Sequence, residues 1–240
     1  MLSYTYELHE GRHCALPKLK GMSMKRVLFT LIALFFLNSP ALAQEDGWTL
    51  DGVAKVESGR IFREQGFTLY DGPTIVGDLT ACRGNFCADL WRAQTSETAM
   101  NETDLTVWWS VPLAEGITFQ PNVAFFELPE FKDVWRGRLT LTVQTSENCN
   151  VSVNADVLRG GLDSEVLRGQ FGCNHQLSED LSLNWRAGAA YDRAFRNTSG
   201  LYHVGVSTHV GQWTGELYGE GFAGTHESDA IVGVSVARRF

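Results

Sequence analysis

The sequence predicts an all-β fold, an antiparallel up-and-down transmembrane β-barrel of about 12 strands whose N and C termini both lie on the periplasmic side. Three observations predict this fold. From Trp48 onward, apolar and polar residues alternate with a period of two almost everywhere. Short connections alternate with longer and more charged ones, as they do between the two ends of a barrel. The chain also ends in a strand-like alternation on an aromatic residue, Phe240, without a polar tail.

The residues before the alternation have the plan of a secretory leader. A charged segment at residues 24–26 precedes the apolar run 27–37, and Ala41-Leu42-Ala43 supplies a cleavage site. The apolar run is too short to span a membrane, which disfavours an N-terminal anchor. We therefore expect export to the outer membrane of a Gram-negative bacterium. The expected parts are an over-extended N-terminus at 1–23, a signal peptide at 24–43 and a barrel at 44–240.

Composition excludes some partners and architectures. The chain carries 20 Lys+Arg against 28 Asp+Glu, a formal net charge of −8, so nucleic acid is not an expected partner. No apolar run after residue 43 is long enough for a membrane-spanning helix. The mature chain must therefore cross a membrane with strands, if it crosses one at all.

Polar turn clusters divide the alternating region into its predicted strands. In the first strand Trp48, Leu50 and Val56 share one face, and Asp51 and Lys55 lie on the other. The same division recurs along the chain, with the polar face too polar for the interior of a β-sandwich. The predicted strands are 48–59, 67–82, 86–96, 103–112, 117–128, 134–145, 149–159, 164–177, 181–192, 199–210, 213–224 and 229–240.

The connections and the aromatic residues separate the two ends of the predicted barrel. Connections after even-numbered strands are tight, as at 83–85 and 211–212, whereas those after odd-numbered strands are mostly longer and charged. Short turns are typical of the periplasmic end and long loops of the outer end. Aromatic residues gather near strand ends, as an interfacial girdle requires: Trp48, Phe86, Trp109, Phe119 and Trp213.

The closing strand explains the aromatic terminus. Val232, Val234, Val236 and Phe240 share one face, and this strand must pair with the first because a lipid-exposed edge would leave backbone groups unsatisfied. The ending resembles the C-terminal signature of bacterial outer-membrane proteins. That resemblance implies that Phe240 acts as a C-terminal insertion signal for the barrel-insertion machinery. Arg238 falls on the lipid-facing side, where only a position near the interface makes its charge tolerable.

Four cysteines follow the predicted leader, and we expect two disulfides. A two-residue Gly84-Asn85 turn places Cys82 directly opposite Cys87. Cys149 and Cys173 are symmetric about Gly161 and fall on the apolar face; their bridge is worth about 3 kcal/mol by loop-closure entropy. A metal site is not expected, because the four sulfurs lie in two separate hairpins.

No catalytic constellation and no cofactor site is expected. Outer-membrane lipases and lipid A deacylases use a His and a Ser two residues apart on a strand. Here His203 and Ser207 are four residues apart, roughly 13 Å along a strand. The remaining candidates, His175, His209 and His226, have no Ser or carboxylate partner that the sequence can argue for. We therefore expect that the protein is not an enzyme.

The order of features resembles the TorF family of porins, small proteobacterial outer-membrane barrels. The resemblance covers most of 48–240. It rests on a first strand flowing into Arg63-Glu64-Gln65-Gly66, on the hairpin "DLTVWWSVPLAEGITFQPNVAFFELPE" and on the closing strand. These motifs are loose and mostly structural, and the cysteine pairs depart from the family pattern. The resemblance implies an outer-membrane channel for small solutes, surrounded by outer-membrane lipids.

The polar face predicts a lumen with charge on opposite walls. The alternation places Arg136, Arg138, Arg168 and Arg186 on one set of inward positions, and Glu57, Asp78, Asp89, Glu216 and Glu220 on another. Such walls produce a field across the pore rather than a ring of one sign. The alternative is that these side chains pair into a salt-bridged plug. At the level of function, the alternatives to a passive channel are a non-conducting structural or adhesive barrel and, less favoured, a lipid-modifying enzyme.

Overall fold

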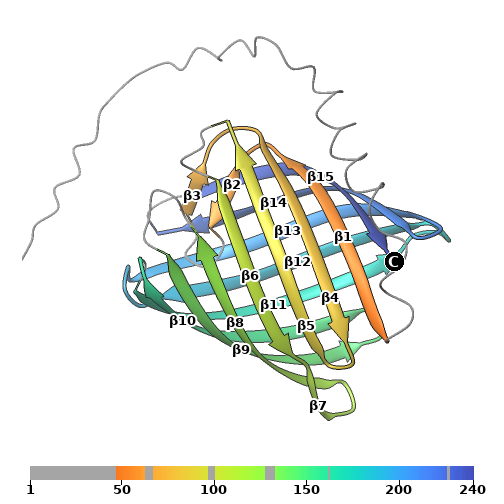
Figure 1. Ribbon diagram of the computed structural model, residues 1–240, viewed down its shortest axis with the longest axis horizontal. Helices are drawn as coiled ribbons and strands as arrows, with labels where there is room; N and C mark the ends of the chain where they lie inside the picture. The colour runs from red at the N-terminus through yellow and green to blue at the C-terminus, as the bar shows by residue number, and fades with distance from the viewer. Residues whose placement is uncertain (1–46, 63–66, 97–100, 128–132, 162, 226–227) are drawn as a thin grey trace, which may run out of the picture. The chain divides into compact units, whose positions relative to one another are not determined.

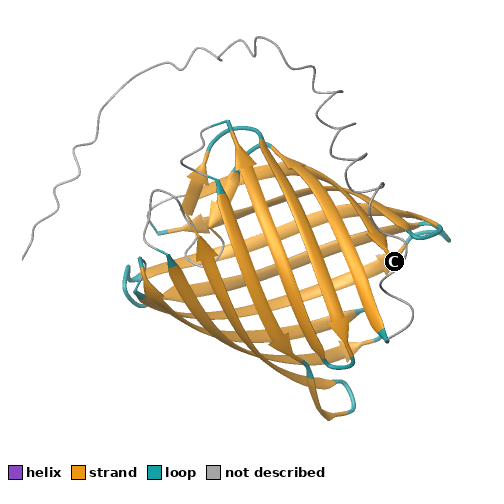
Figure 2. Ribbon diagram, viewed as in Figure 1, coloured by secondary structure: helices purple, strands orange, loops and turns teal. Residues whose placement is uncertain are grey.

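A computed structural model of the chain describes residues 47–62, 67–96, 101–127, 133–161, 163–225 and 228–240 (Figure 1). The expected leader, at 1–23 and 24–43, lies outside the described residues. The described residues form strands and short connections (Figure 2). Among them there is no helix long and apolar enough to cross a membrane.

Twelve antiparallel strands close into a barrel, as the sequence predicts. The seam joins the two ends of the barrel sequence, because β1 pairs with β15, and the ring closes where β6 pairs with β8. The barrel strands are β1 (Trp48–Glu57), β4 (Thr74–Arg83), β5 (Phe86–Thr95), β6 (Glu102–Trp109), β8 (Ile117–Glu127), β9 (Val134–Ser146), β10 (Cys149–Gly160), β11 (Ser164–Gln176), β12 (Leu181–Asp192), β13 (Asn197–Val210), β14 (Trp213–Gly224) and β15 (Ser228–Arg239).

One predicted strand is wrong. The segment 67–82 does not run through as a single strand: β3 (Phe67–Tyr70) ends before Asp71, and β4 begins at Thr74. The break falls at Asp71-Gly72-Pro73, where turn residues and a proline without an N–H interrupt the ladder. β3 pairs instead with β2 (Arg60–Phe62) in a separate two-stranded sheet. We call this pair of strands the hairpin.

A second boundary also differs from the prediction. The strand expected at 103–112 is interrupted at Ser110, and β7 (Val111–Ala114) continues its direction against the start of β8. The turn therefore lies at Glu115-Gly116, where Gly116 has a φ of 69°. A positive φ is accessible to glycine without a steric penalty, which explains why the chain reverses here rather than at Pro112.

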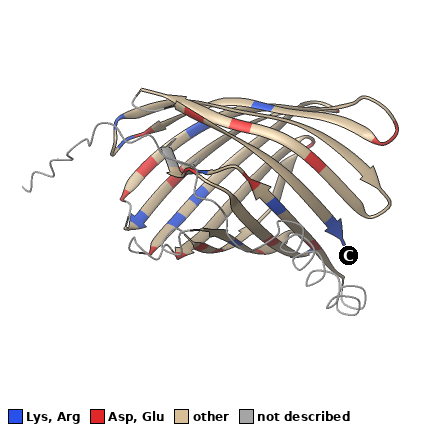
Figure 3. Ribbon diagram, turned by 90° about the horizontal axis from the view of Figure 1, so that it is seen from above, with Lys and Arg blue, Asp and Glu red and all other residues tan. Residues whose placement is uncertain are grey.

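The barrel has an apolar outer face and a polar inner face. In β15, Val232, Val234 and Val236 are exposed on the outside, whereas Gly233 and Ser235 between them are buried. Charged residues lie along the strands and not only in the connections (Figure 3). Since successive side chains of a strand point to opposite faces, this alternation places most strand charges inside the ring.

The two ends of the barrel differ, and we name them by their connections. The turn end carries the short connections, for example Gly84-Asn85 and Gly211-Gln212, together with the C-terminus. The loop end carries the connections that begin after β1, β5, β8, β10, β12 and β14. The register brings the predicted aromatic residues Trp48, Phe86 and Trp109 together at the turn end, since Trp48 and Phe86 both pair with Arg83, and Phe86 with Trp109.

The C-terminus is fixed into the seam. The Phe240 N–H donates to the carbonyl of Leu50 (2.8 Å), and Arg239 donates to the Asp51 carboxylate (2.9 Å). The Arg238 guanidinium lies over the rings of Trp213 (5.0 Å) and Phe240 (4.5 Å), so its charge is held among aromatic rings at the turn end. This arrangement gives a physical reason for an arginine on the outer face of the closing strand.

Candidate functional site in the barrel lumen

The nine charged residues that the sequence assigns to a lumen all lie on inner-face positions of their strands. Alternation with outward side chains places them there, as for Arg136, which is buried between the exposed Trp135 and Gly137. The four arginines come from β9, β11 and β12, and the five acids from β1, β4, β5 and β14. The strand order makes each set a contiguous or nearly contiguous arc of the ring. We call them the basic arc (Arg136, Arg138, Arg168 and Arg186) and the acidic arc (Glu57, Asp78, Asp89, Glu216 and Glu220).

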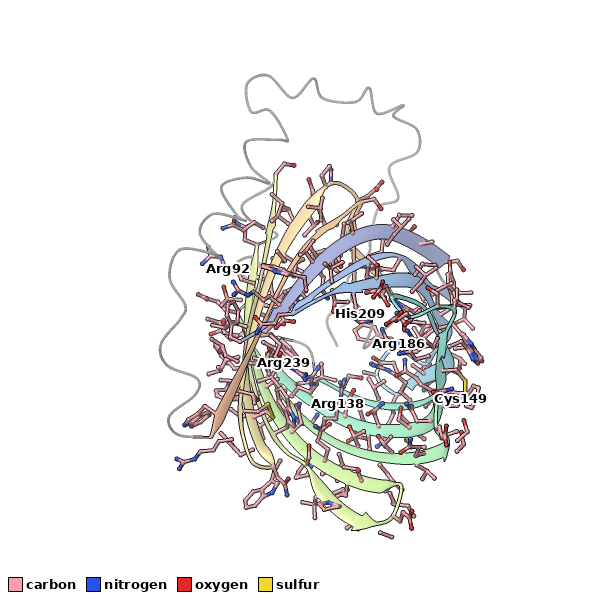
Figure 4. All side chains as sticks on the ribbon, turned by 90° about the vertical axis from the view of Figure 1, so that its right-hand side faces the viewer. Arg92, Arg138, Cys149, Arg186, His209 and Arg239 are labelled. Carbon is pink, nitrogen blue, oxygen red and sulfur yellow. A yellow bond between two sulfur atoms is a disulfide. The ribbon has the colours of Figure 1, made fainter. Side chains whose placement is uncertain are left out.

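An aspartate inside the basic arc partly neutralises it. Asp156 of β10 lies directly opposite Arg138, which donates to both carboxylate oxygens, at 2.5 and 2.7 Å. Arg168 lies 3.9 Å away on the other side, and Asp156 is 2% exposed. A buried carboxylate held by two guanidiniums is stable only while both partners remain. Arg138, Asp156 and Arg168 therefore form a network rather than a row of independent charges. Figure 4 shows Arg138 and Arg186 inside the ring of strands.

The acidic arc is organised by neighbouring hydroxyl groups. Thr80 donates to Asp89 (2.8 Å), and the Tyr218 hydroxyl donates to Glu57 (2.5 Å). The second contact crosses the whole width of β15, because Gly233 pairs with both residues and a Cβ there would collide with the tyrosine ring. A glycine on the inner face thus lets one strand's side chain reach the next strand but one.

A cavity of about 350 Å³ lies in the lumen toward the turn end, where it is lined by Asn148 of the β9–β10 turn. Asn150, Asn174 and Asn184 contribute amide groups from three adjacent strands. Two small inner residues, Gly205 of β13 and Gly233 of β15, make room on this wall for the side chains of Glu216 and Tyr218. The titratable or phenolic side chains that line the cavity are Lys55, Arg186, His203, Glu216, Tyr218 and Glu220.

His203 links the acids of this cavity into one network. Its Nδ1 lies 3.4 Å from Glu220 and its Nε2 lies 3.6 Å from Glu216, and its ring stacks on Tyr218 with centroids 5.4 Å apart. Asn184 donates to the same Glu216 oxygen (3.2 Å), which lies over Gly205. These contacts fix the positions of two carboxylates on the wall of a hollow, polar site.

The expected distance between His203 and Ser207 leaves them with different partners. Both lie on the inner side of β13, but His203 contacts the two glutamates, and Ser207 accepts a hydrogen bond from Asn184 (3.2 Å). A nucleophilic serine needs a base within hydrogen-bond reach. The geometry of these two residues does not provide that contact.

Toward the loop end, apolar side chains form a buried cluster on the inner face, and buried polar residues such as Asp192 and Ser199 lie beyond it. Eight buried residues form one cluster on the inner face of seven consecutive strands, and Leu69 of the hairpin packs against it. We call this the loop-end cluster: Ala124, Phe126, Val134, Leu158, Val166, Ala190, Leu201 and Phe222. Sequence reasoning missed it, although a signal existed, since the inner positions of β10 read Asn154, Asp156 and then Leu158. The polar face becomes apolar toward the loop end.

A buried ion pair fixes the hairpin inside the ring. Arg60 of β2 forms a salt bridge with Glu102 of β6, and both side chains are almost completely buried. The Arg60 guanidinium also lies 4.7 Å from the ring centre of Trp91 on β5. The hairpin, which connects β1 to β4, therefore contacts β5 and β6 as well as the loop-end cluster. Arg60 and Glu102 were not among the predicted site residues, because nothing in the local pattern joins two residues so distant in sequence.

Both expected disulfides are present, and they lie on opposite faces. Cys82 pairs with Cys87 on the inner face, and Cys149 pairs with Cys173 on the outer face beside Phe171 and Trp185 (Figure 4). Their Cα atoms are 4.1 Å apart in each pair, as expected for directly opposed residues. His175 lies within 4.8 Å of the second pair, but sulfurs bonded to each other offer no thiolate to a metal ion.

Comparisons with known proteins show the fold alone. No family model and no curated protein matches the chain, so the resemblance to the TorF porins stays an expectation. Among solved structures, the chain is similar to the KdgM porin in complex with disordered oligogalacturonate (TM-score 0.58, 11% identity, covering 80% of this chain and 99% of that one). An outer membrane channel from Pseudomonas putida F1 has a TM-score of 0.53 at 12% identity, over 84% of this chain and 99% of its own.

A third similar structure is named as a translocator domain and not as a porin. The translocator domain of the autotransporter NalP from Neisseria meningitidis has a TM-score of 0.53 at 12% identity, covering 90% of this chain and 95% of its own. The structural neighbours are thus outer-membrane barrels, mostly porins and channels. Function must be argued from the lumen itself.

Proposed function

We propose that the protein is an outer-membrane porin, a passive channel for small solutes. The observation that carries the proposal is the inner face: a ring of twelve strands encloses charged, hydrogen-bonded side chains and a polar cavity, while the outer face is apolar. An apolar exterior and a polar interior are what a barrel in lipid requires. The porin structures of the same fold support this choice over an enzyme.

The proposal includes a location and an orientation. The leader at 24–43 would direct export, and Phe240 on the closing strand would serve as the signal for the barrel-insertion machinery. The turn end, with both ends of the barrel sequence, would face the periplasm, and the loop end would face the exterior. Lipids would contact the exposed outer side chains.

The two arcs would set the selectivity. Arginines on β9 to β12 face a lumen whose other wall carries the acids of β14, β1, β4 and β5. In a narrow lumen these charges are screened less than at an open surface, and a field crosses the pore. Such a pore favours solutes that carry both charges or strong dipoles, rather than ions of one sign.

The loop-end cluster favours a second candidate, a non-conducting barrel with a structural or adhesive role. The cluster and the hairpin place apolar, buried side chains where a solute would have to pass. A dry constriction of this kind blocks ions even when the rest of the lumen is wet. Under the porin proposal, conduction requires displacement of the hairpin.

Planar-bilayer recording of the refolded protein separates the two candidates. Discrete conductance steps at a fixed applied voltage are expected for the porin. A silent bilayer, with insertion verified by protease protection of the barrel, would contradict the porin and support the closed barrel.

A further inference from the structure

The turn-end cavity combines fixed charges of both signs in an ordered way. The register aligns Arg186, His203 and Glu220 in one row across β12, β13 and β14. A parallel row aligns Glu216 with Ser235 and then with Lys55, across β14, β15 and β1. The two glutamates therefore occupy the middle of the wall, with one cation on each side.

The glutamates are held by the protein, and the Lys55 ammonium is not. Glu216 is positioned by Asn184 and His203, and Glu220 by His203. Within the described part of the chain, Lys55 forms no hydrogen bond and no ion pair, although it lines the cavity and is only partly exposed. The negative potential of Glu216 and Asp78 reaches it without direct contact. The three N–H donors of this ammonium can therefore contact a ligand in the cavity.

The spacing of these charges matches a small ligand. Neighbouring strands lie about 4.8 Å apart, so Lys55 and Glu216 start from Cα atoms roughly 10 Å apart, with only Ser235 between them. Two long side chains that converge from this separation leave room for a group a few ångströms across. The volume of about 350 Å³ is large enough for a small solute.

We propose that this cavity is a binding site for a small zwitterionic solute, whose carboxylate contacts Lys55 and whose ammonium contacts Glu216 and Glu220. A solute with one charge of either sign would meet both attraction and repulsion on this wall. A neutral polyol would leave the Lys55 ammonium without a counter-charge. The proposal names the solute class of the proposed porin, but binding needs only an open turn end and does not depend on conduction.

The test uses four small probes of related structure that differ in their charged groups. L-serine carries both charges, glycerate replaces the ammonium by a hydroxyl, ethanolamine lacks the carboxylate, and glycerol has no charge. Titration calorimetry of the refolded barrel at fixed ionic strength should show L-serine binding about tenfold tighter than each of the others, the range expected for one charge-assisted contact. Glycerol or glycerate binding as tightly as L-serine, or no binding of L-serine, would overturn the proposal.

Matched variants locate the site. Lys55→Gln should weaken L-serine about tenfold and leave ethanolamine unchanged, whereas Glu216→Gln should weaken both. Arg193→Gln removes an exposed cation at the loop end and should change neither. Unchanged L-serine affinity in Lys55→Gln, with a native circular dichroism spectrum, would overturn the assignment. If L-serine binds but bilayers stay silent, the binding site stands and the porin function fails.

Discussion

The two ends of the lumen are formed by the same strands but are lined by different kinds of side chain. On β13, the loop-end half of the inner face carries Leu201 next to the buried Asn197 and Ser199, and the turn-end half carries Gly205 and Ser207. On β14, Phe222 at the loop end contrasts with Glu216 at the turn end. Large apolar residues fill the first region, whereas small residues leave space for charged side chains in the second. Under the porin proposal, the barrier and the solute-binding groups therefore lie in separate places.

Substitutions at the two ends of the lumen should therefore affect different properties. Changes at the loop end should alter whether the barrel conducts and how stable it is. Changes at the turn end should alter what is bound and which ions pass.

The ion pair that fixes the hairpin gives the largest expected effect. Glu102→Ala leaves the buried Arg60 guanidinium without its partner, and breaking one side of a buried pair costs about 3–5 kcal/mol. The hairpin should therefore leave the loop end, and single-channel conductance should rise. The double variant Arg60→Met with Glu102→Leu replaces both charges by apolar groups and should stay near wild type. Equal conductance in the wild type and in Glu102→Ala would show that the hairpin does not form the barrier to conduction.

The loop-end cluster should depend on its largest side chain. Phe222 is 1% exposed, and Phe222→Ala should lower the free energy of unfolding by about 3–5 kcal/mol through lost burial and the resulting cavity.

At the turn end, Tyr218→Phe removes only the hydroxyl that donates a hydrogen bond to Glu57, and the free energy of unfolding should fall by about 1–3 kcal/mol. Urea titrations of refolding measure both. A larger loss for Tyr218→Phe would reverse the assignment of the packed and the polar regions.

The sequence predicts the parts of this comparison unequally. Alternation gives the faces of every strand, and the Gly84-Asn85 turn gives the pairing of Cys82 with Cys87. Alternation does not give the pairing of β2 with β3, but Asp71-Gly72-Pro73 is a turn signal that marks the end of β3 and that the predicted strand 67–82 overlooked. The contact of Arg60 with Glu102 also depends on tertiary folding, since 42 residues separate them. Local periodicity contains no information on such pairs.

The cavity also could be predicted only in part from the sequence. Glu216, Glu220 and Arg186 line the cavity, and the sequence predicts all three on inner faces. Their neighbours on adjacent strands follow only from the register. Gly205 and Gly233 look like weak strand positions in the sequence. Their role is visible only when Glu216 and Tyr218 are seen to lie across them.

The two disulfides should differ in their contribution to stability. Cys149–Cys173 closes a loop with a sequence separation of 24, and Cys82–Cys87 one of 5. Loop-closure entropy gives about 3 kcal/mol for the first and about 2 kcal/mol for the second. The double Cys→Ser variants of each pair, unfolded in urea, should keep this order. The reverse order would show that strain or residual structure in the unfolded chain outweighs loop length.

The smallest effect concerns selectivity, and the structure decides which residue tests it. Arg138 is a poor probe, because its removal leaves Asp156 with Arg168 alone and confounds charge with stability. Arg186 lines the cavity, so Arg186→Gln removes one positive charge from the basic arc with little change in size. The reversal potential in a salt gradient should shift toward cations, and Glu220→Gln should shift it toward anions, because each substitution changes one wall of the transverse field. Both shifts should become smaller in concentrated salt, because the Debye screening length decreases. A conducting wild type whose reversal potential neither variant changes would mean that these side chains only solvate the wall.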